Sequence, residues 1–138
     1  MLAYHTALEL HGRSYSIQDQ LVHLTSKYPS GRSFKFQGID YRAVAPPTKL
    51  NNKEPDVETG DRAGQSVRVT DLERTFVDVL DRTRLSGGWE EVWRSLETIP
   101  YLDLDRVVEY ALLLGNSATV ARVGFFLSQH RDALSRGR

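Results

Sequence analysis

The sequence predicts an α+β fold: an N-terminal helix, a small, mostly antiparallel sheet and a C-terminal cluster of about four helices. Two observations lead to this prediction. Apolar residues alternate with a period of two in several stretches between positions 20 and 70, and after Val69 they recur at helical spacing. Strands grouped in the first half and helices in the second are typical of α+β proteins. The length of 138 residues is that of one domain with one core.

The first half begins with a short helix. Apolar residues from Leu2 to His11 stand at near-helical spacing, and Gly12 supplies a left-handed stop. Alternation then predicts four strands, at 21–25, 33–36, 41–44 and 66–69. The glycine turn between the second and third strands predicts a hairpin. Residues 46–64 are interpreted as a long polar loop with room for a short strand around Val57, and loops of this length are commonly functional or mobile.

Four helices are expected in the second half, from 72 to about 82, from 89 to Pro100, from 104 to Gly115 and from Ser117 onward, before a basic tail at 136–138. Thr70-Asp71-Leu72-Glu73 is interpreted as a capping box, with the threonine oxygen accepting from the backbone and Glu73 reaching back. Asp103 is expected to cap the third of these helices, with Leu102 and Val107 as a hydrophobic staple. Its core-facing residues are predicted to be Leu104, Val107, Val108, Ala111 and Leu112.

Charge and composition exclude several classes of protein. Eighteen basic and eighteen acidic residues cancel, which argues against a general polyanion binder. Residues 20–49 nevertheless hold five cations against one acid, and residues 66–110 hold six arginines against ten acids, so a polarised surface is possible. The absence of cysteine removes disulfides, thiolate zinc sites and cysteine nucleophiles. No apolar run would span a bilayer and no signal peptide is present, so we expect a cytoplasmic protein without membrane contact.

Motifs for catalysis or cofactor binding are weak throughout. The four histidines do not share a helix face, no phosphate-binding glycine loop is present, and no serine lies in a nucleophile elbow. Asp56 and Glu58 are the best candidates for a metal-dependent nuclease, but no lysine follows an acid at the spacing of such sites. We therefore expect no catalytic residue, metal or cofactor, and keep the nuclease as a third hypothesis.

A helix-turn-helix is the better alternative. Ala111, Gly115 and Ala121 have the spacing of its small first-helix residue, its turn glycine and its buried second-helix residue. The second helix would offer Arg122 and Gln129 to base edges. The runner-up function is therefore a DNA-binding transcriptional regulator.

The densest local signal is the segment 67–78, a strand that enters a capped helix. Asp71 and Glu73 favour a helix N-terminus, and Arg74 can pair with Asp78 at i, i+4. These interactions alone would explain the residues as structural.

Together with its surroundings, this segment resembles the C-terminal domain of the AbiEi-family antitoxins, from bacterial type IV toxin–antitoxin and abortive-infection systems. Tyr4 to Gly12 is similar to the family's helix with its Leu-His-Gly stop. Val69 to Thr75 with Asp78 is similar to its strand followed by Asp-x-Glu-Arg-Thr-x-x-Asp. Gly87-Gly88 before a helix and Ala121 to Leu127 complete four matches in order, which cover nearly the whole chain.

The resemblance implies an antitoxin that counteracts a nucleotidyltransferase-like toxin encoded beside it, in phage defence. In the usual architecture a winged helix precedes this domain and binds operator DNA. Because Met1 stands just before the first match, we expect residues 1–138 to be a single domain without the winged helix.

The expected mechanism is binding rather than catalysis, with the toxin or the toxin's target as partner and nucleic acid as a weaker possibility. The candidate contact surface is a basic strand face together with the 46–64 loop and Arg74; the residues of that face are Lys35, Arg42 and Lys49. The motif residues are expected to be structural or partner-facing: Asp71, Glu73, Arg74, Thr75, Asp78 and Arg122.

Overall fold

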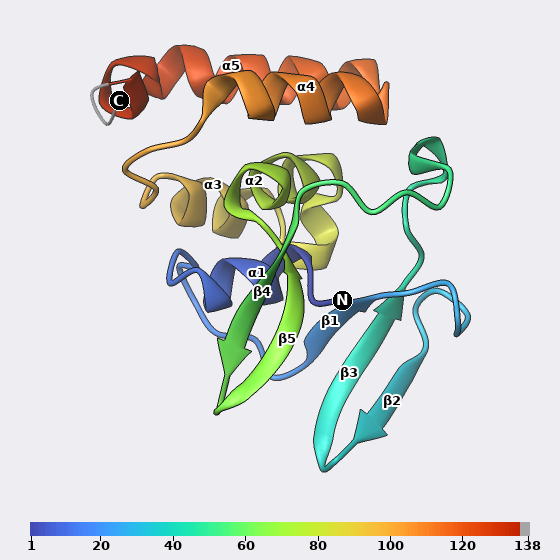
Figure 1. Ribbon diagram of the computed structural model, residues 1–138. Helices are drawn as coiled ribbons and strands as arrows, with labels where there is room; N and C mark the ends of the chain where they lie inside the picture. The colour runs from blue at the N-terminus through green and yellow to red at the C-terminus, as the bar shows by residue number, and fades with distance from the viewer. Residues whose placement is uncertain (136–138) are drawn as a thin grey trace.

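The computed structural model describes residues 1–135, and the predicted basic tail at 136–138 lies outside the described residues. It confirms the α+β fold (Figure 1). The strands are β1 (Leu21–Leu24), β2 (Ser33–Phe36), β3 (Ile39–Val44), β4 (Val57–Arg62) and β5 (Gln65–Thr70). The helices are α1 (Tyr4–Leu10), α2 (Leu72–Asp81), α3 (Trp89–Leu96), α4 (Leu104–Leu114) and α5 (Ser117–Ser135), with short 3₁₀ turns η1 (Thr48–Leu50) and η2 (Thr83–Ser86).

The strands form two small sheets that the first residues of the chain join. One sheet has the order β1-β3-β2, with β1 parallel and β2 antiparallel to β3, and the other is the antiparallel β4–β5 hairpin. The backbone NH of Leu2 donates to Arg68 O over 2.9 Å, and Thr70 N donates to Leu2 O over 3.1 Å. On the other side, Leu24 N donates to Met1 O over 2.8 Å. The predicted helix therefore starts only at Tyr4, because residues 1–3 are extended between β1 and β5.

The predicted hairpin is confirmed as β2–β3. Gly38 occupies its turn with a φ of +79°, a conformation that residues with a Cβ rarely adopt. Figure 1 shows this hairpin and the β4–β5 hairpin projecting from the same end of the molecule, while α4 and α5 lie across the opposite end. The molecule is thus a helical body that carries two β-ribbons.

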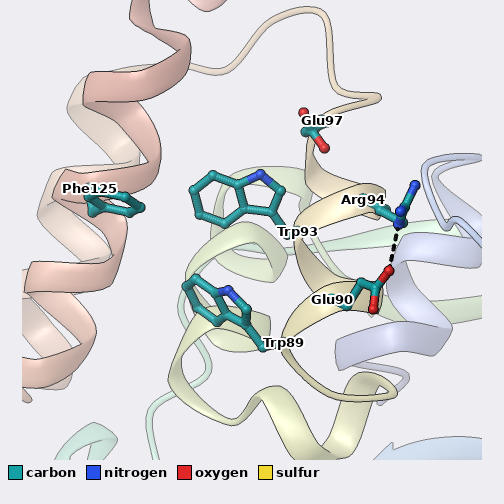
Figure 2. Close-up of a pocket in the computed structure, with 6 residues that line it drawn as sticks. All are labelled: Trp89, Glu90, Trp93, Arg94, Glu97 and Phe125. Atoms are coloured by element: carbon teal, nitrogen blue, oxygen red, sulfur yellow. Dashed lines mark hydrogen bonds and ion pairs between the residues drawn. The ribbon is translucent and has the colours of Figure 1, made fainter.

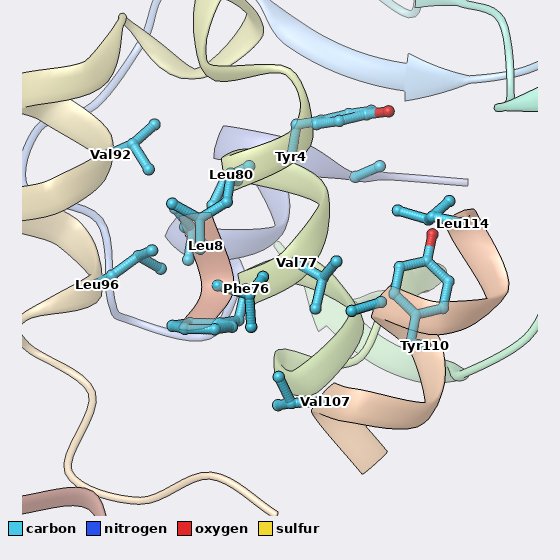
Figure 3. Packing of buried hydrophobic residues seen from close by; sticks show 14 of the residues in the cluster. Tyr4, Leu8, Phe76, Val77, Leu80, Val92, Leu96, Val107, Tyr110 and Leu114 are labelled. Atoms are coloured by element: carbon cyan, nitrogen blue, oxygen red, sulfur yellow. The ribbon is translucent and has the colours of Figure 1, made fainter. Parts of the chain in front are cut away.

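Helix α2 lies at the centre of the helical body and packs against α1, α3, α4 and α5. Its Phe76 meets Phe126 of α5 edge to face, with ring centroids 5.3 Å apart. Figure 3 shows how α1, α3 and α4 supply the surrounding side chains. The four predicted C-terminal helices therefore share one core.

The predicted core face of α4 was partly wrong. Val107 and Ala111 are buried as expected, whereas Val108 is 48% exposed and Leu112 is 64% exposed. Tyr110 and Leu114 fill the core in their place. Helix α4 carries two apolar stripes, and the buried one includes Tyr110 because its hydroxyl finds an acceptor inside the protein.

The predicted capping box was also wrong in its cap residue. Asp71, and not Thr70, is the N-cap of α2, and its carboxylate accepts from Arg74 N over 2.9 Å. The cap at Asp103 is confirmed, since its carboxylate accepts from Arg106 N. The predicted 46–64 loop is shorter than expected, because η1 and β4 occupy much of it. None of the described helices is long and apolar enough to cross a membrane.

Candidate functional site

The motif residues lie where β5, α2 and α4 meet, and they bond mainly to each other. Arg74 Nε donates to Asp78 Oδ2 over 3.1 Å, so the predicted i, i+4 pair is present, and both side chains are only 1% exposed. The hydroxyl of Tyr110 donates to Asp78 Oδ1 over 2.6 Å. Arg74 Nη1 donates to Pro55 O over 2.8 Å. The carboxylate of Asp78 thus has one donor on each oxygen.

Burial controls the protonation of this cluster. It raises the pKa of Asp78 from 3.8 to about 6, against the Arg74 charge and the Tyr110 hydroxyl, which both favour the carboxylate. Burial alone would lower the pKa of Arg74, but the Asp78 carboxylate outweighs it, so the pKa of Arg74 is raised. Burial and the neighbouring Asp78 charge also raise the pKa of Tyr110. At neutral pH the cluster is therefore an ion pair with a neutral phenol.

Thr75 ties the first turn of α2 to the end of β5. Its Oγ1 lies 2.6 Å from Asp71 O, 3.1 Å from Thr70 O and 2.8 Å from Thr70 Oγ1. Because a hydroxyl has one proton, the shortest contact assigns Thr75 as donor to Asp71 O and Thr70 as donor to Thr75. Both threonines are buried.

Arg106 joins the cluster although no sequence signal pointed to it. Its guanidinium bonds to the carboxylates of Asp56, Asp71 and Glu73, which lie 50, 35 and 33 residues away in the chain. Glu73 also accepts from Asp103 N over 3.1 Å. Hydrogen bonding to Asp56 is the largest influence that raises the pKa of Arg106, and burial raises the pKa of Asp71. This cluster anchors α4 to the start of α2.

The residues considered for a nuclease do not converge. Asp56 is paired with Arg106 at 3.1 Å, and Glu58 lies 3.7 Å from His11 Nδ1. Among the described side chains, those of residues 1–130, no group of three or more acidic or histidine residues is arranged to hold a metal ion.

The predicted basic surface was wrong in two of its members. Arg74 is buried and cannot touch a partner. Lys49 lies in η1 beside the α4–α5 turn, not on a strand. Lys35 and Arg42 do share one sheet face, since Ser33 pairs with Arg42 and Lys35 with Asp40 in the hairpin register. Lys35 Nζ lies 3.8 Å from Asp40.

Arg122 is an exposed residue of α5, but its guanidinium forms a hydrogen bond within the protein. Nη1 donates to Leu80 O over 2.9 Å and thereby binds a free carbonyl at the end of α2. The helix-turn-helix alternative relied on this side chain for contacts to bases. Helix α4 ends at Gly115 as predicted, and the structure shows this residue in a left-handed conformation.

A shallow hollow, the tryptophan hollow, opens between α3 and α5 (Figure 2). It has a volume of about 380 Å³ and is lined by Trp89, Glu90, Trp93, Arg94, Glu97 and Phe125. The rings of Trp89 and Trp93 are 5.3 Å apart, and those of Trp93 and Phe125 are 5.7 Å apart. Trp89 is 44% and Phe125 is 54% exposed, so both present aromatic surface to solvent.

A larger hollow, the ribbon groove, lies between the β2–β3 and β4–β5 hairpins. Its volume is about 520 Å³, and one wall carries aromatic side chains of β2 and β3. The basic residues that line it are Lys27, Arg62 and Arg68, none of which was among the predicted contact residues. The alternating aromatic residues of β2 and β3 were the sequence signal for this groove. Alternation alone does not show which face of the sheet is exposed to solvent.

Comparison with protein-family models and with curated proteins finds no match for this chain.

Proposed function

We propose that this chain is an antitoxin-type domain of the AbiEi kind, which counteracts a nucleotidyltransferase-like toxin by binding the toxin or the toxin's target. The observation that supports this proposal is that most of the motif residues are buried and bond to other parts of the protein. Asp71, Thr75 and Asp78 are buried and bonded internally, as is Arg74. The motif residues therefore hold the fold together. A chain that shares this motif with the AbiEi antitoxins is expected to share the fold on which their antitoxic surface is built.

The tryptophan hollow is the surface that we assign to the protein partner. Large aromatic side chains that are exposed on firmly packed helices are common anchors of protein interfaces. The ring of Trp93 packs against the buried Phe126, with ring centroids 4.7 Å apart. The exposed rings of Trp89 and Phe125 therefore pack against a side chain that the core fixes in position. The edge holds Glu90 and Glu97 against one cation, Arg94, which pairs with Glu90 at 3.1 Å, so the excess of acid favours a partner that is basic at this point.

Co-expression tests the proposal. The chain is expressed together with the nucleotidyltransferase-like toxin encoded beside it, and colony formation is counted. We expect the unchanged chain to restore growth and Trp89→Ala combined with Phe125→Ala to lose most of this rescue. Leu112→Ala is the matched control, because Leu112 is also apolar and exposed but lies on α4.

Two results would contradict the proposal. If the unchanged chain does not restore growth, the antitoxin function fails. If the double variant is folded, as judged by circular dichroism, and rescues as well as Leu112→Ala, the assignment of the tryptophan hollow fails.

A further inference from the structure

We propose that the ribbon groove binds single-stranded nucleic acid, with bases against its aromatic wall and phosphates along its basic rim. This inference does not rest on the antitoxin function, because a purified domain would bind an oligonucleotide whether or not it neutralises a toxin.

The aromatic wall follows from the register of the β1-β3-β2 sheet. Phe34 pairs with Tyr41, and their rings are stacked with centroids 5.3 Å apart and planes 11° apart. Tyr28 continues the row, 4.9 Å from Phe34, and the His23 ring meets Phe34 edge on at 6.1 Å. The wall thus presents a continuous row of rings.

Part of this wall is open to solvent. Phe36 is 60% exposed, and Phe34 and Tyr41 are only half-buried. In an ordinary two-layer domain the apolar face of a small sheet is covered by helices. Here α1 contacts β1 of the same sheet, but no residue of a described helix lines the groove, and the β4–β5 hairpin forms the facing wall.

The rim carries one sign of charge. Lys27, Arg62 and Arg68 line the groove, and no aspartate or glutamate is among the lining residues. Arg68 is bonded to Glu54, whereas Lys27 and Arg62 make no ion pair with the side chains that the structure describes, those of residues 1–130.

The combination favours a nucleic acid strand over a polypeptide. Single-stranded nucleic acids are bound by grooves that offer cations to the backbone and aromatic rings to the bases. A polypeptide could also pack against the aromatic rings, but it would need acidic side chains to pair with the basic residues of the rim. The tryptophan hollow differs in this respect, since beside its rings it carries two carboxylates, Glu90 and Glu97, against one cation, Arg94.

Fluorescence anisotropy of labelled oligonucleotides tests the inference. The purified chain is titrated into oligo-U, oligo-dT and a duplex, each of about 12 nucleotides, at about 50 mM and about 200 mM salt. We expect single strands to bind more tightly than the duplex and to weaken with salt. The two single strands distinguish RNA from DNA as the preferred source.

Variants then locate the site. Phe36→Ala removes an exposed ring and is expected to weaken binding roughly 5- to 150-fold, the effect of losing one base–aromatic contact. Arg62→Ala is expected to weaken binding and to flatten its salt dependence. Lys35→Ala is the control for charge, because Lys35 lies on the other face of the same sheet, and should bind like the unchanged chain.

The inference is overturned if no single strand binds at low salt, or if Phe36→Ala and Lys35→Ala bind alike. It is also overturned if Phe36→Ala abolishes growth rescue while the unchanged chain binds no oligonucleotide, because the groove would then hold a polypeptide. If the unchanged chain binds oligonucleotides but does not restore growth, only the antitoxin function is contradicted.

Discussion

Replacing Tyr110 by phenylalanine removes one hydroxyl and leaves the ring in place. That hydroxyl donates to Asp78 Oδ1 over 2.6 Å, and both residues are buried. Because the acceptor is a carboxylate, the bond belongs to the charge-assisted class, whose net contribution is about 1.5–3 kcal/mol. We expect Tyr110→Phe to lower the free energy of unfolding by about 2 kcal/mol near neutral pH, which corresponds to a fall in Tm of roughly 6–10 °C for a domain of this size.

The size of this loss depends on pH, because ionised Asp78 is the group that needs the donor. The pKa of Asp78 in the folded protein is raised to about 6, above its value in the unfolded chain. Proton uptake by Asp78 therefore stabilises the fold as the pH falls through about 6 toward the unfolded pKa, and this stabilisation is lost as the pH rises. Loss of the Tyr110 donor raises the folded pKa of Asp78 further. The deficit of the variant is then largest at alkaline pH, shrinks as the pH falls toward about 6, and is small below it.

Urea unfolding at about pH 8 and about pH 5 measures both effects. The fluorescence of Trp89 and Trp93, which lie on α3, reports the transition. Tyr101→Phe is the matched control, since Tyr101 is 39% exposed and its hydroxyl makes no hydrogen bond within the described residues. The reasoning is refuted if Tyr110→Phe behaves like Tyr101→Phe, or if its deficit is the same at both pH values.

Three further substitutions test neighbouring contacts by the same unfolding measurement. Tyr4→Phe should leave stability unchanged or raise it by up to about 1 kcal/mol, because the buried Tyr4 hydroxyl has no hydrogen-bond partner among the described side chains, those of residues 1–130; a clear loss of stability would contradict this. Arg106→Gln should cost about 1 kcal/mol, and less at high salt, since it leaves three carboxylates facing each other; equal stability at all salt concentrations would contradict this. Thr75→Val should cost about 1–3 kcal/mol while Thr75→Ser keeps most of the stability, and equal losses would show that the methyl group, not the hydroxyl, matters.

Local signals in the sequence predicted most of the elements. The β2–β3 hairpin follows from alternation and a glycine turn, and the end of α4 follows from Gly115, because these features depend only on neighbouring residues. The parallel pairing of β1 with β3 and the bridging of the two sheets by Leu2 were not predicted, since their partners are distant in the chain. Strand β4 was anticipated only as a short strand around Val57, and its extent to Arg62 was missed for another reason. Its residues lie on an exposed two-stranded ribbon with only partial burial, so they show no apolar alternation.

The candidate site was predictable to the same extent. The Arg74–Asp78 pair follows from the i, i+4 spacing, but the burial that turns it into a core element comes from α4, through Tyr110. Arg106 was missed because each of its three partners is more than thirty residues away. Lys35 and Arg42 were correctly placed on one strand face, yet the open aromatic groove lies on the other.

The motif and the ribbon groove are connected through the segment that leads into β4. Arg74 donates to Pro55 O, and Asp71 N donates to Asp56 O over 2.9 Å. Asp56 is held as well by Arg106. A two-stranded ribbon is marginally stable by itself, so the position of the β4–β5 hairpin depends on such anchors at its base. A motif that touches no ligand can therefore still govern binding, because it fixes one wall of the groove in which we place the nucleic acid.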